Sequence, residues 1–290
     1  MGLNKVLILG ATGMLGSACI KVLGLNPGLE IIGTSRHSNQ NCVEFDAAKD
    51  DIGELLNRIK PNWIINCIGV IKPYINEGEY DSIANAHRIN SEFPILLAGG
   101  ALELNSKVIQ IATDCVFSGD SGLYSETDPH DATDVYGKTK SQGEASGPNF
   151  MNVRSSIIGP EVGRSTSLLE WFRNQPVNAK LNGFTDHLWN GITTYHFARM
   201  CAGVIDADEF FHGVHHFIPG DIVSKAELLH IFAEVYGRTD ISISDVESNQ
   251  SINRTLKTNQ NEINKRLWKL AGYDKAPTVK EMVIEQANQA

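Results

Sequence analysis

Residues 5–16 read Lys5-Val6-Leu7-Ile8-Leu9-Gly10-Ala11-Thr12-Gly13-Met14-Leu15-Gly16, an apolar run that leads directly into three glycines. A continuous apolar run is typical of a buried parallel strand. The residues that follow, 17–23, have the pattern of a helix, and Gly24 is placed to end it. The stretch therefore predicts a strand, a glycine turn and a helix.

This arrangement suits a dinucleotide. Glycines let the backbone approach a pyrophosphate closely, and the free N–H groups of the first helical turn attract an anion. The spacing is GxxGxxG and not the standard GxGxxG. The alternative is a tight turn that binds nothing. We predict cofactor contacts from Gly10, Thr12, Gly13, Met14, Leu15 and Gly16.

The rest of the first half continues the alternation of strands and helices. Further strands are predicted at residues 30–34, 42–45, 63–67 and 107–112, and a long helix at about 80–104. Right-handed crossovers then place helices on both faces of one parallel sheet. We predict an α/β fold, a Rossmann-type doubly wound parallel sheet with a smaller C-terminal substrate-binding domain. The first domain is predicted to span 1–155 with about 186–212, and the second 156–185 and 213–290.

Composition restricts the class of protein. The 290 residues are 42% hydrophobic, enough for a sizeable core, and helical spacing marks residues 167–172 and 226–233 as core faces. A formal net charge of −9 without a basic cluster argues against nucleic acid as a partner. No apolar segment is long enough to span a bilayer, so no membrane contact is predicted. The five cysteines form no CxxC pair, which predicts reduced thiols, no metal and a cytoplasmic protein.

The end of the second strand bears on the choice of cofactor. Ser35 and Arg36 offer a hydroxyl and a cation where an acidic residue would bind the ribose of NAD. We therefore predict NADP, with NAD possible, and the alternative for Arg36 is a solvated loop residue. Asp46 and Ala47 follow the third strand, where an adenine can lie, and Asp46 can equally cap a helix.

Chemically useful side chains follow the next two strands. Cys67, Ile68 and Gly69 lie at the same carboxyl edge as Thr113, whose hydroxyl can stabilise charge on a carbonyl oxygen. A lone Thr more often bonds its own backbone. Tyr136 and Lys140 are four residues apart and share a helix face. An ammonium beside a phenol favours the phenolate, so we expect a lowered Tyr136 pKa and a role as proton donor.

Together these motifs resemble an extended short-chain dehydrogenase/reductase. Thr113-Asp114-Cys115-Val116-Phe117-Ser118-Gly119 is similar to the TDYVFxG signature of dTDP-4-dehydrorhamnose reductases, and Tyr136-Gly137-Lys138-Thr139-Lys140-Ser141-Gln142-Gly143-Glu144 resembles their YGxTKxxGE. Residues 154–156 resemble RTS, residues 186–194 resemble DQxGxPT and residues 213–217 resemble GxYH. The departures, which include Cys115 in place of Tyr and His187 in place of Gln, put the identity of the sugar in doubt.

The resemblance implies reduction of a nucleotide-linked 4-keto-6-deoxy sugar by NAD(P)H, in polysaccharide biosynthesis. It implies that Tyr136 is the general acid, that Lys140 lowers its pKa and holds the nicotinamide ribose, and that Thr113 polarises the carbonyl. Asn90 is implied to order the helix and a water near the cofactor. On the substrate side we predict Lys72, Asp114, Cys115, Arg154 and Trp189, with Arg164 a further cation for the diphosphate. The alternatives are a solvated Lys72, a core Trp189 and arginines paired with carboxylates.

Two rival functions remain. One is a nucleotide-sugar epimerase of the same fold, which regenerates its cofactor in each cycle. The other is a non-catalytic, reductase-like regulatory subunit, against which the presence of Thr113, Tyr136 and Lys140 argues. No pattern indicates the oligomeric state, and a homodimer is the assembly we consider.

Overall fold

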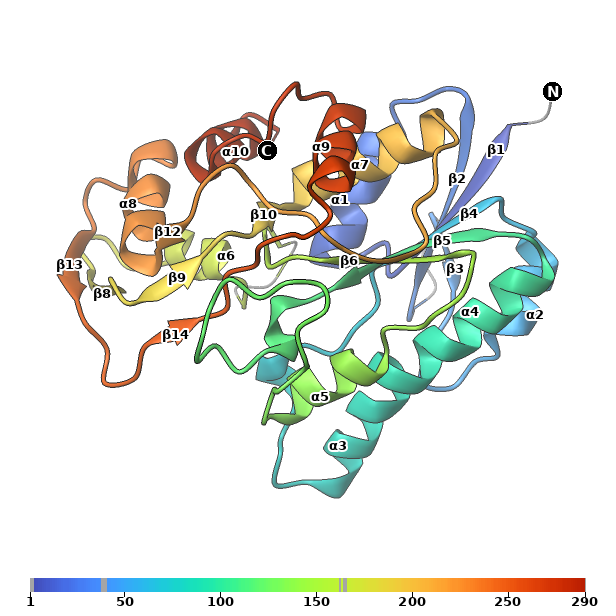
Figure 1. Ribbon diagram of the computed structural model, residues 1–290, viewed down its shortest axis with the longest axis horizontal. Helices are drawn as coiled ribbons and strands as arrows, with labels where there is room; N and C mark the ends of the chain where they lie inside the picture. The colour runs from blue at the N-terminus through green and yellow to red at the C-terminus, as the bar shows by residue number, and fades with distance from the viewer. Residues whose placement is uncertain (1–2, 38–40, 162, 164–165, 290) are drawn as a thin grey trace.

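The computed structural model describes residues 3–37, 41–161, 163 and 166–289. Its centre is a parallel seven-stranded sheet in the order β11-β6-β5-β4-β1-β2-β3 (Figure 1). These strands are β1 (Asn4–Leu9), β2 (Leu29–Ser35), β3 (Cys42–Glu44), β4 (Trp63–Asn66), β5 (Lys107–Ala112), β6 (Phe150–Arg154) and β11 (Gly213–His216). The predicted doubly wound parallel sheet is confirmed.

Helices cover both faces of this sheet (Figure 1). On one face lie α1 (Met14–Leu23) and α7 (Thr194–Asp206), which pack against each other. On the other lie α2 (Ile52–Ile59), α3 (Tyr80–His87), α4 (Phe93–Glu103) and α5 (Val135–Gln142). Within the described part of the chain, no helix combines the length and the apolar character needed to cross a membrane.

Strand β1 shows why the N-terminal run is apolar at every position. Val6 and Ile8 belong to the hydrophobic cluster that includes α1 and α7, whereas Leu7 and Leu9 belong to the cluster with α2 and α4. All four side chains are fully buried. A strand in the middle of a sheet covered on both faces has no solvent side, so its sequence does not alternate.

The predicted helix at 80–104 is present as three consecutive pieces. Between α3 and α4 lies a π-helical turn, η2 (Arg88–Glu92). Single π turns inside helices are uncommon and occur frequently at functional sites. This one contains Asn90.

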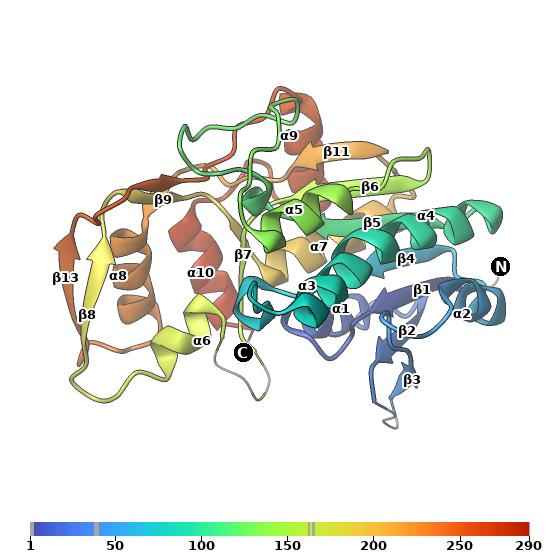
Figure 2. The same ribbon diagram turned by 90° about the horizontal axis from the view of Figure 1, so that it is seen from below.

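The C-terminal part of the chain adds smaller sheets beside the main one, together with α6 (Leu168–Arg173) and α8 (Lys225–Val235) (Figure 2). A three-stranded sheet has the order β12-β9-β14, formed by Val223–Ser224, His187–Trp189 and Ile252–Asn253. Two pairs complete the set, β8 (Lys180–Phe184) with β13 (Ser242–Val246) and β7 (Ile157–Ile158) with β10 (Ile192–Thr193). Helices α9 (Asn261–Leu270) and α10 (Val279–Ala287) follow.

One predicted domain boundary needs correction. We assigned residues 213–290 to the substrate-binding domain, but β11 begins at Gly213 and pairs with β6 as the edge strand of the main sheet. The stretch 213–217, which resembles GxYH, contains this last parallel strand, so the main sheet continues past residue 212. The division of the chain into two domains stays a prediction.

Candidate active site

The structure gives a different reason for glycine at each of the three positions of the N-terminal turn. Gly10 has φ +79°, and a Cβ there would lie 3.1 Å from Ile68. A Cβ on Gly16 would lie 2.1 Å from the carbonyl oxygen of Gly10, so α1 packs directly on the turn. At Gly13 the nearest atom to a Cβ is 3.4 Å away. The protein itself therefore needs Gly10 and Gly16, whereas a Cβ on Gly13 would make only an ordinary van der Waals contact at the start of α1.

The start of α1 is the predicted pyrophosphate site. Among the described residues no side chain caps α1 at Gly13, and its first turn contains no acidic residue. The first N–H groups are thus left for an anion. Thr12 is exposed beside them and Met14 is half-buried, whereas Leu15 is buried in the core and can offer only its backbone.

The predicted ribose side lies at the ends of β2 and β3. Arg36 is exposed, and the Ser35 hydroxyl donates to the carbonyl of His37 at 2.6 Å. Burial raises the pKa of Asp46, but the Ala48 N–H, Lys49 and Arg36 outweigh it and hold that pKa below its ordinary value. Asp46 thus carries a negative charge close to Arg36, in a turn where its carboxylate accepts the Ala48 N–H at 3.0 Å.

The loop after β4 forms the floor beneath the glycine turn. The backbone of Cys67 lies 3.4 Å from the Cβ position of Gly10. Two asparagines shape this loop: Asn66 accepts the N–H of Ile68 at 3.1 Å, and Asn90 accepts the N–H of Val70 at 2.8 Å. The Asn90 amide also donates to the Val70 carbonyl at 2.9 Å and to the Thr139 hydroxyl at 3.2 Å. Asn90 therefore joins the loop containing Gly69 to α5.

Thr113 and Tyr136 meet at the end of β5. The Thr113 hydroxyl is close enough to act on the Tyr136 phenol, whose pKa it lowers, and it lies 3.2 Å from Asp114 Oδ1. Thr113 accepts the N–H of Cys115 at 3.1 Å, which is the backbone role of the alternative interpretation. Thr113 therefore has a side-chain contact with Asp114 and a backbone contact with Cys115 at the same time.

The expected lowering of the Tyr136 pKa is not found. Burial and then the neighbouring Cys115 raise the pKa of this phenol, Thr113 opposes them, and Asp114 raises it further. Burial disfavours the phenolate, so this phenol keeps its proton. At neutral pH Tyr136 is therefore fully in the donor form.

Lys140 is buried and points to the sheet. Its ammonium donates to the carbonyl of Ile111 in β5 at 3.1 Å. Burial lowers the pKa of Lys140 to about 8, with Glu144 and Cys67 acting in the opposite direction. The amine is thus mainly protonated at neutral pH. The effect of Cys67 on this pKa places the ammonium near the loop that follows β4.

Two glycines allow α5 to lie so close to these neighbours. A Cβ on Gly137 would be 2.3 Å from the carbonyl oxygen of Cys115, and one on Gly143 would be 1.7 Å from that of Asn90. Asp134 caps the helix by accepting the N–H of Gly137 at 2.8 Å. The glycines in the YGxTKxxGE-like stretch are therefore packing requirements that set the position of Tyr136.

The predicted substrate residues meet different outcomes. Lys72 is exposed and pairs with Asp134 at 2.8 Å, so it lies at the N-terminus of α5. Asp114 is half-buried, and burial raises its pKa against the opposing effects of Arg254 and Lys225. Burial raises the pKa of the Cys115 thiol to about 12, so this cysteine is uncharged. Arg164 lies outside the described residues.

The structure contradicts the prediction for Arg154. Both ends of its guanidinium fork bind the carboxylate of Glu144, each at 2.7 Å, and the group also contacts His130 at 2.6 Å and His216 at 3.3 Å. Arg154 is 2% exposed. A guanidinium surrounded in this way holds α5 and its following loop to β6 and has no group left for a diphosphate.

Trp189 is also a core residue. It is 4% exposed and its indole N–H donates to Ser156 at 2.8 Å, so its ring face is not available to a base. Its contribution is indirect, because the ammonium of Lys225 lies 5.3 Å from the centre of the ring. Motif reasoning missed Lys225 and Arg254, the two cations that act on Asp114, since neither belongs to a recognisable local pattern.

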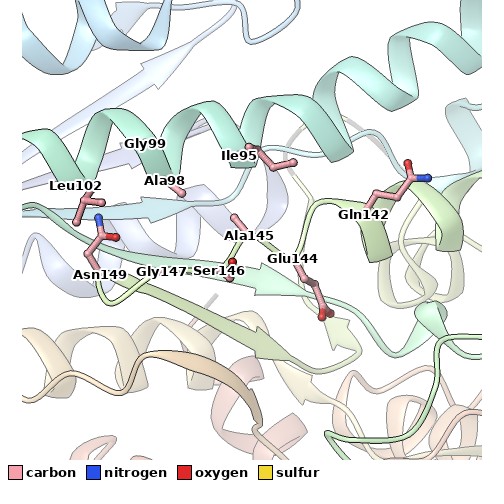
Figure 3. A pocket seen from close by; sticks show the side chains of 10 residues that line it. All are labelled: Ile95, Ala98, Gly99, Leu102, Gln142, Glu144, Ala145, Ser146, Gly147 and Asn149. Atoms are coloured by element: carbon pink, nitrogen blue, oxygen red, sulfur yellow. The ribbon is translucent and has the colours of Figure 1, made fainter.

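A surface groove of about 320 Å³ lies away from this constellation (Figure 3). Ile95, Ala98 and Leu102 of α4 form one side, and Glu144, Ala145 and Asn149 lie on the other. None of the predicted catalytic or cofactor residues lines it. The groove therefore belongs to the outer surface of α4 and not to the site at the carboxyl edge of the sheet.

Known proteins with similar sequences agree with this architecture. A dTDP-4-dehydrorhamnose reductase from Aggregatibacter actinomycetemcomitans is 27% identical over 232 residues, which is 76% of this chain and 75% of that protein. The "Methionine adenosyltransferase 2 subunit beta" of Danio rerio is 24% identical over 247 residues, 80% of this chain and 74% of that protein.

A solved structure shares the fold. The dTDP-4-dehydrorhamnose reductase of Bacillus anthracis strain Ames in complex with NADP superimposes with a TM-score of 0.79 at 18% identity, covering 99% of this chain and 100% of that one. The family model described as "RmlD substrate binding domain" matches residues 4–290. The chain therefore belongs to the RmlD substrate-binding domain family, with the extended short-chain dehydrogenase/reductase fold of the dTDP-4-dehydrorhamnose reductases.

Proposed function

We propose that this protein is an NADPH-dependent reductase of a keto group on a nucleotide-linked sugar, with 4-keto-6-deoxy sugars favoured by its motifs. The observation that carries the proposal is that Thr113 acts on Tyr136 at the end of β5, while Lys140, on the same helix as Tyr136, donates to Ile111 of that strand. The three residues lie at the carboxyl edge of the sheet, which is where parallel sheets bind ligands.

The cofactor fits the residues present. The open position at Gly13 and the uncapped start of α1 suit a pyrophosphate. Arg36 is exposed at the end of β2, where its guanidinium can pair with a 2′-phosphate, which favours NADP over NAD. When bound, the reduced nicotinamide supplies a hydride to the carbonyl carbon.

The chain's own residues supply the proton and the charge. Tyr136 holds its proton at neutral pH and donates it to the carbonyl oxygen as general acid. The phenolate that remains is unfavourable in this buried place, so the Thr113 hydroxyl and the Lys140 ammonium have an anion to stabilise. Lys140, with a pKa near 8, is charged for that role.

The test is to mix the purified protein with NADPH or NADH and a panel of 4-keto nucleotide sugars. Stoichiometric loss of absorbance by the reduced nicotinamide supports the reductase. Sugar conversion without net oxidation of the cofactor identifies an epimerase and overturns the proposal. The Tyr136→Phe variant serves as the negative control.

A second candidate is a subunit that binds the same ligands without turnover. Its support is the similarity to proteins named methionine adenosyltransferase 2 subunit beta, a name that describes part of another enzyme. Saturable binding of NADPH and a nucleotide sugar, with no conversion of either, would favour it.

A further inference from the structure

Two cations from the C-terminal part of the chain, Lys225 and Arg254, act on Asp114 in the segment that follows β5. In the three-stranded sheet, Ser224 of β12 and Asn253 of β14 both pair with Leu188 of β9. Lys225 and Arg254 are the residues that follow them. The small sheet therefore places the two residues next to opposite neighbours of the same strand, and both act on Asp114.

Arg254 is held by one hydrogen bond. Its Nε donates to the carbonyl of Phe117 at 2.9 Å, and its Cγ lies 3.1 Å from the Cβ position of Gly119. Among the described residues, the two terminal nitrogens of its guanidinium have no hydrogen-bond acceptor and no carboxylate within salt-bridge distance. A guanidinium anchored through Nε presents those nitrogens as a fork.

Lys225 is also without an acceptor. Its ammonium lies 5.3 Å above the Trp189 ring and makes no hydrogen bond or ion pair with the part of the chain that the structure describes. The residue is half-buried, and burial lowers its pKa to about 8, so it is mainly charged at neutral pH. An ammonium removed from water without an acceptor is costly unless a ligand supplies one.

The charges around these cations do not balance. Lys225 and Arg254 both act on Asp114, whose carboxylate accepts the Thr113 hydroxyl at 3.2 Å. Arg254 also acts on Asp134, but that carboxylate is already paired with Lys72 at 2.8 Å. Two cations and one free carboxylate leave an excess of one positive charge next to the catalytic threonine, in a chain whose net charge is −9.

We propose that Lys225 and Arg254 form a subsite for a carboxylate on the sugar of the substrate, close to the carbonyl that Tyr136 protonates. The proposal rests on the reductase function, and it replaces the simple 4-keto-6-deoxy sugars that the motifs favour with a keto sugar that carries a carboxylate. An excess of one charge matches a monoanion better than the two negative charges of a diphosphate. A fork and a point charge together satisfy both carboxylate oxygens.

The test compares two ligands that differ by one carboxylate. Glucuronate and glucose, each linked to UDP and to dTDP, are titrated calorimetrically into the full-length protein. We expect the glucuronate form to bind about 10- to 100-fold more tightly, as hydrogen bonds to a charged group allow. We expect Lys225→Met and Arg254→Met each to abolish this preference while leaving affinity for the glucose form unchanged. Lys265→Met, at an exposed pair on α9, is the matched control.

Several outcomes overturn the subsite. They are equal affinities for the two sugars in both nucleotide series, or variants that weaken both ligands by the same factor, which would assign the cations to the shared diphosphate. Thermal unfolding verifies that each variant is folded, and Lys225→Gln or Arg254→Gln replaces the Met variant at the same position if it is not. Because binding is measured without turnover, intact preference in a protein with no reductase activity would overturn the proposed reaction and not the subsite.

Discussion

The ammonium of Lys140 lies 3.1 Å from the carbonyl oxygen of Ile111, two residues before Thr113. This contact ties α5, which contains Tyr136, to the strand that precedes Thr113, and so adds to the close packing of Gly137 and Gly143. Lys140 therefore holds its position through the sheet. An ammonium has two further N–H groups, which remain for a ribose and for the tyrosine.

Replacing Tyr136 by Phe removes the proton donor without changing the volume of the side chain. We expect kcat for sugar reduction to fall by about 10²–10⁴-fold, as for a lost general acid. NADPH affinity should change little. The measurement is initial-rate kinetics together with fluorescence titration of NADPH. Tyr80→Phe, at a fully solvated position of α3, is the control, and near-normal turnover by Tyr136→Phe would exclude it as the acid.

The pH dependence should report Lys140. Its pKa is lowered to about 8, so the charged form is lost as pH rises through that value, whereas the raised pKa of Tyr136 keeps the phenol protonated. We expect kcat/KM for reduction to be level near neutrality and to decline above about pH 8. In Lys140→Arg, which stays charged, the decline should move to higher pH even if the rate is lower. An unchanged midpoint in that variant would assign the decline to another group.

Gly13 and Gly16 should respond differently to Ala. A methyl group on Gly16 would meet the Gly10 carbonyl at 2.1 Å, so Gly16→Ala should destabilise the fold, by roughly 1–3 kcal/mol as for an overpacked site. At Gly13 the protein has room, so Gly13→Ala should keep its stability and lose dinucleotide affinity. Chemical denaturation and NADPH titration on both variants check this. Equal NADPH binding by Gly13→Ala and the parent would place the pyrophosphate elsewhere.

Arg154 should matter for folding and not for substrate. Its partner Glu144 is almost as buried, with 3% and 6% of the side chains exposed. Removing one member leaves the other as an unpaired buried charge, so Arg154→Met should lower the free energy of unfolding by about 3–5 kcal/mol. Removing both, with Glu144→Met added, should recover much of the loss. Urea unfolding measures this, and a raised KM with unchanged stability would restore the predicted substrate role.

Arg36 should set the choice of cofactor. Arg36→Ser removes a cation from an exposed loop, so we expect kcat/KM with NADPH to fall by about 10- to 100-fold and that with NADH to stay the same. Steady-state kinetics with both cofactors is the measurement. Arg58→Ser, on the exposed face of α2, is a control for general loss of charge. A parallel fall with both cofactors would contradict a specific phosphate contact.

Local patterns predicted most of the scaffold. The apolar run and its glycines indicated β1 and α1 because a buried central strand and a close βα turn each restrict the residues along one short segment. The Tyr136 and Lys140 pair indicated a shared helix face for the same reason, since four residues make one turn. The boundary at residue 213 was wrong because strand pairing, and not local sequence, assigns β11 to the main sheet.

Local sequence did not predict how the charged groups of the site are paired. Arg154 is indistinguishable in the sequence from a phosphate-binding arginine, and only the fold brings Glu144 and His216 around it. The prediction that the Tyr136 pKa is lowered was wrong, because it considered the charge of Lys140 and not the burial of the phenol.

The sequence by itself determined the strands of the sheet, the glycine turn and the spacing of Tyr136 and Lys140, because each depends on residues within a few positions of one another. The tertiary structure alone decided which cations are already satisfied and which remain free beside Asp114. Burial and charge pairing depend on segments far apart in the chain, such as Lys225 and Arg254 against residue 114, and no local spacing encodes that meeting.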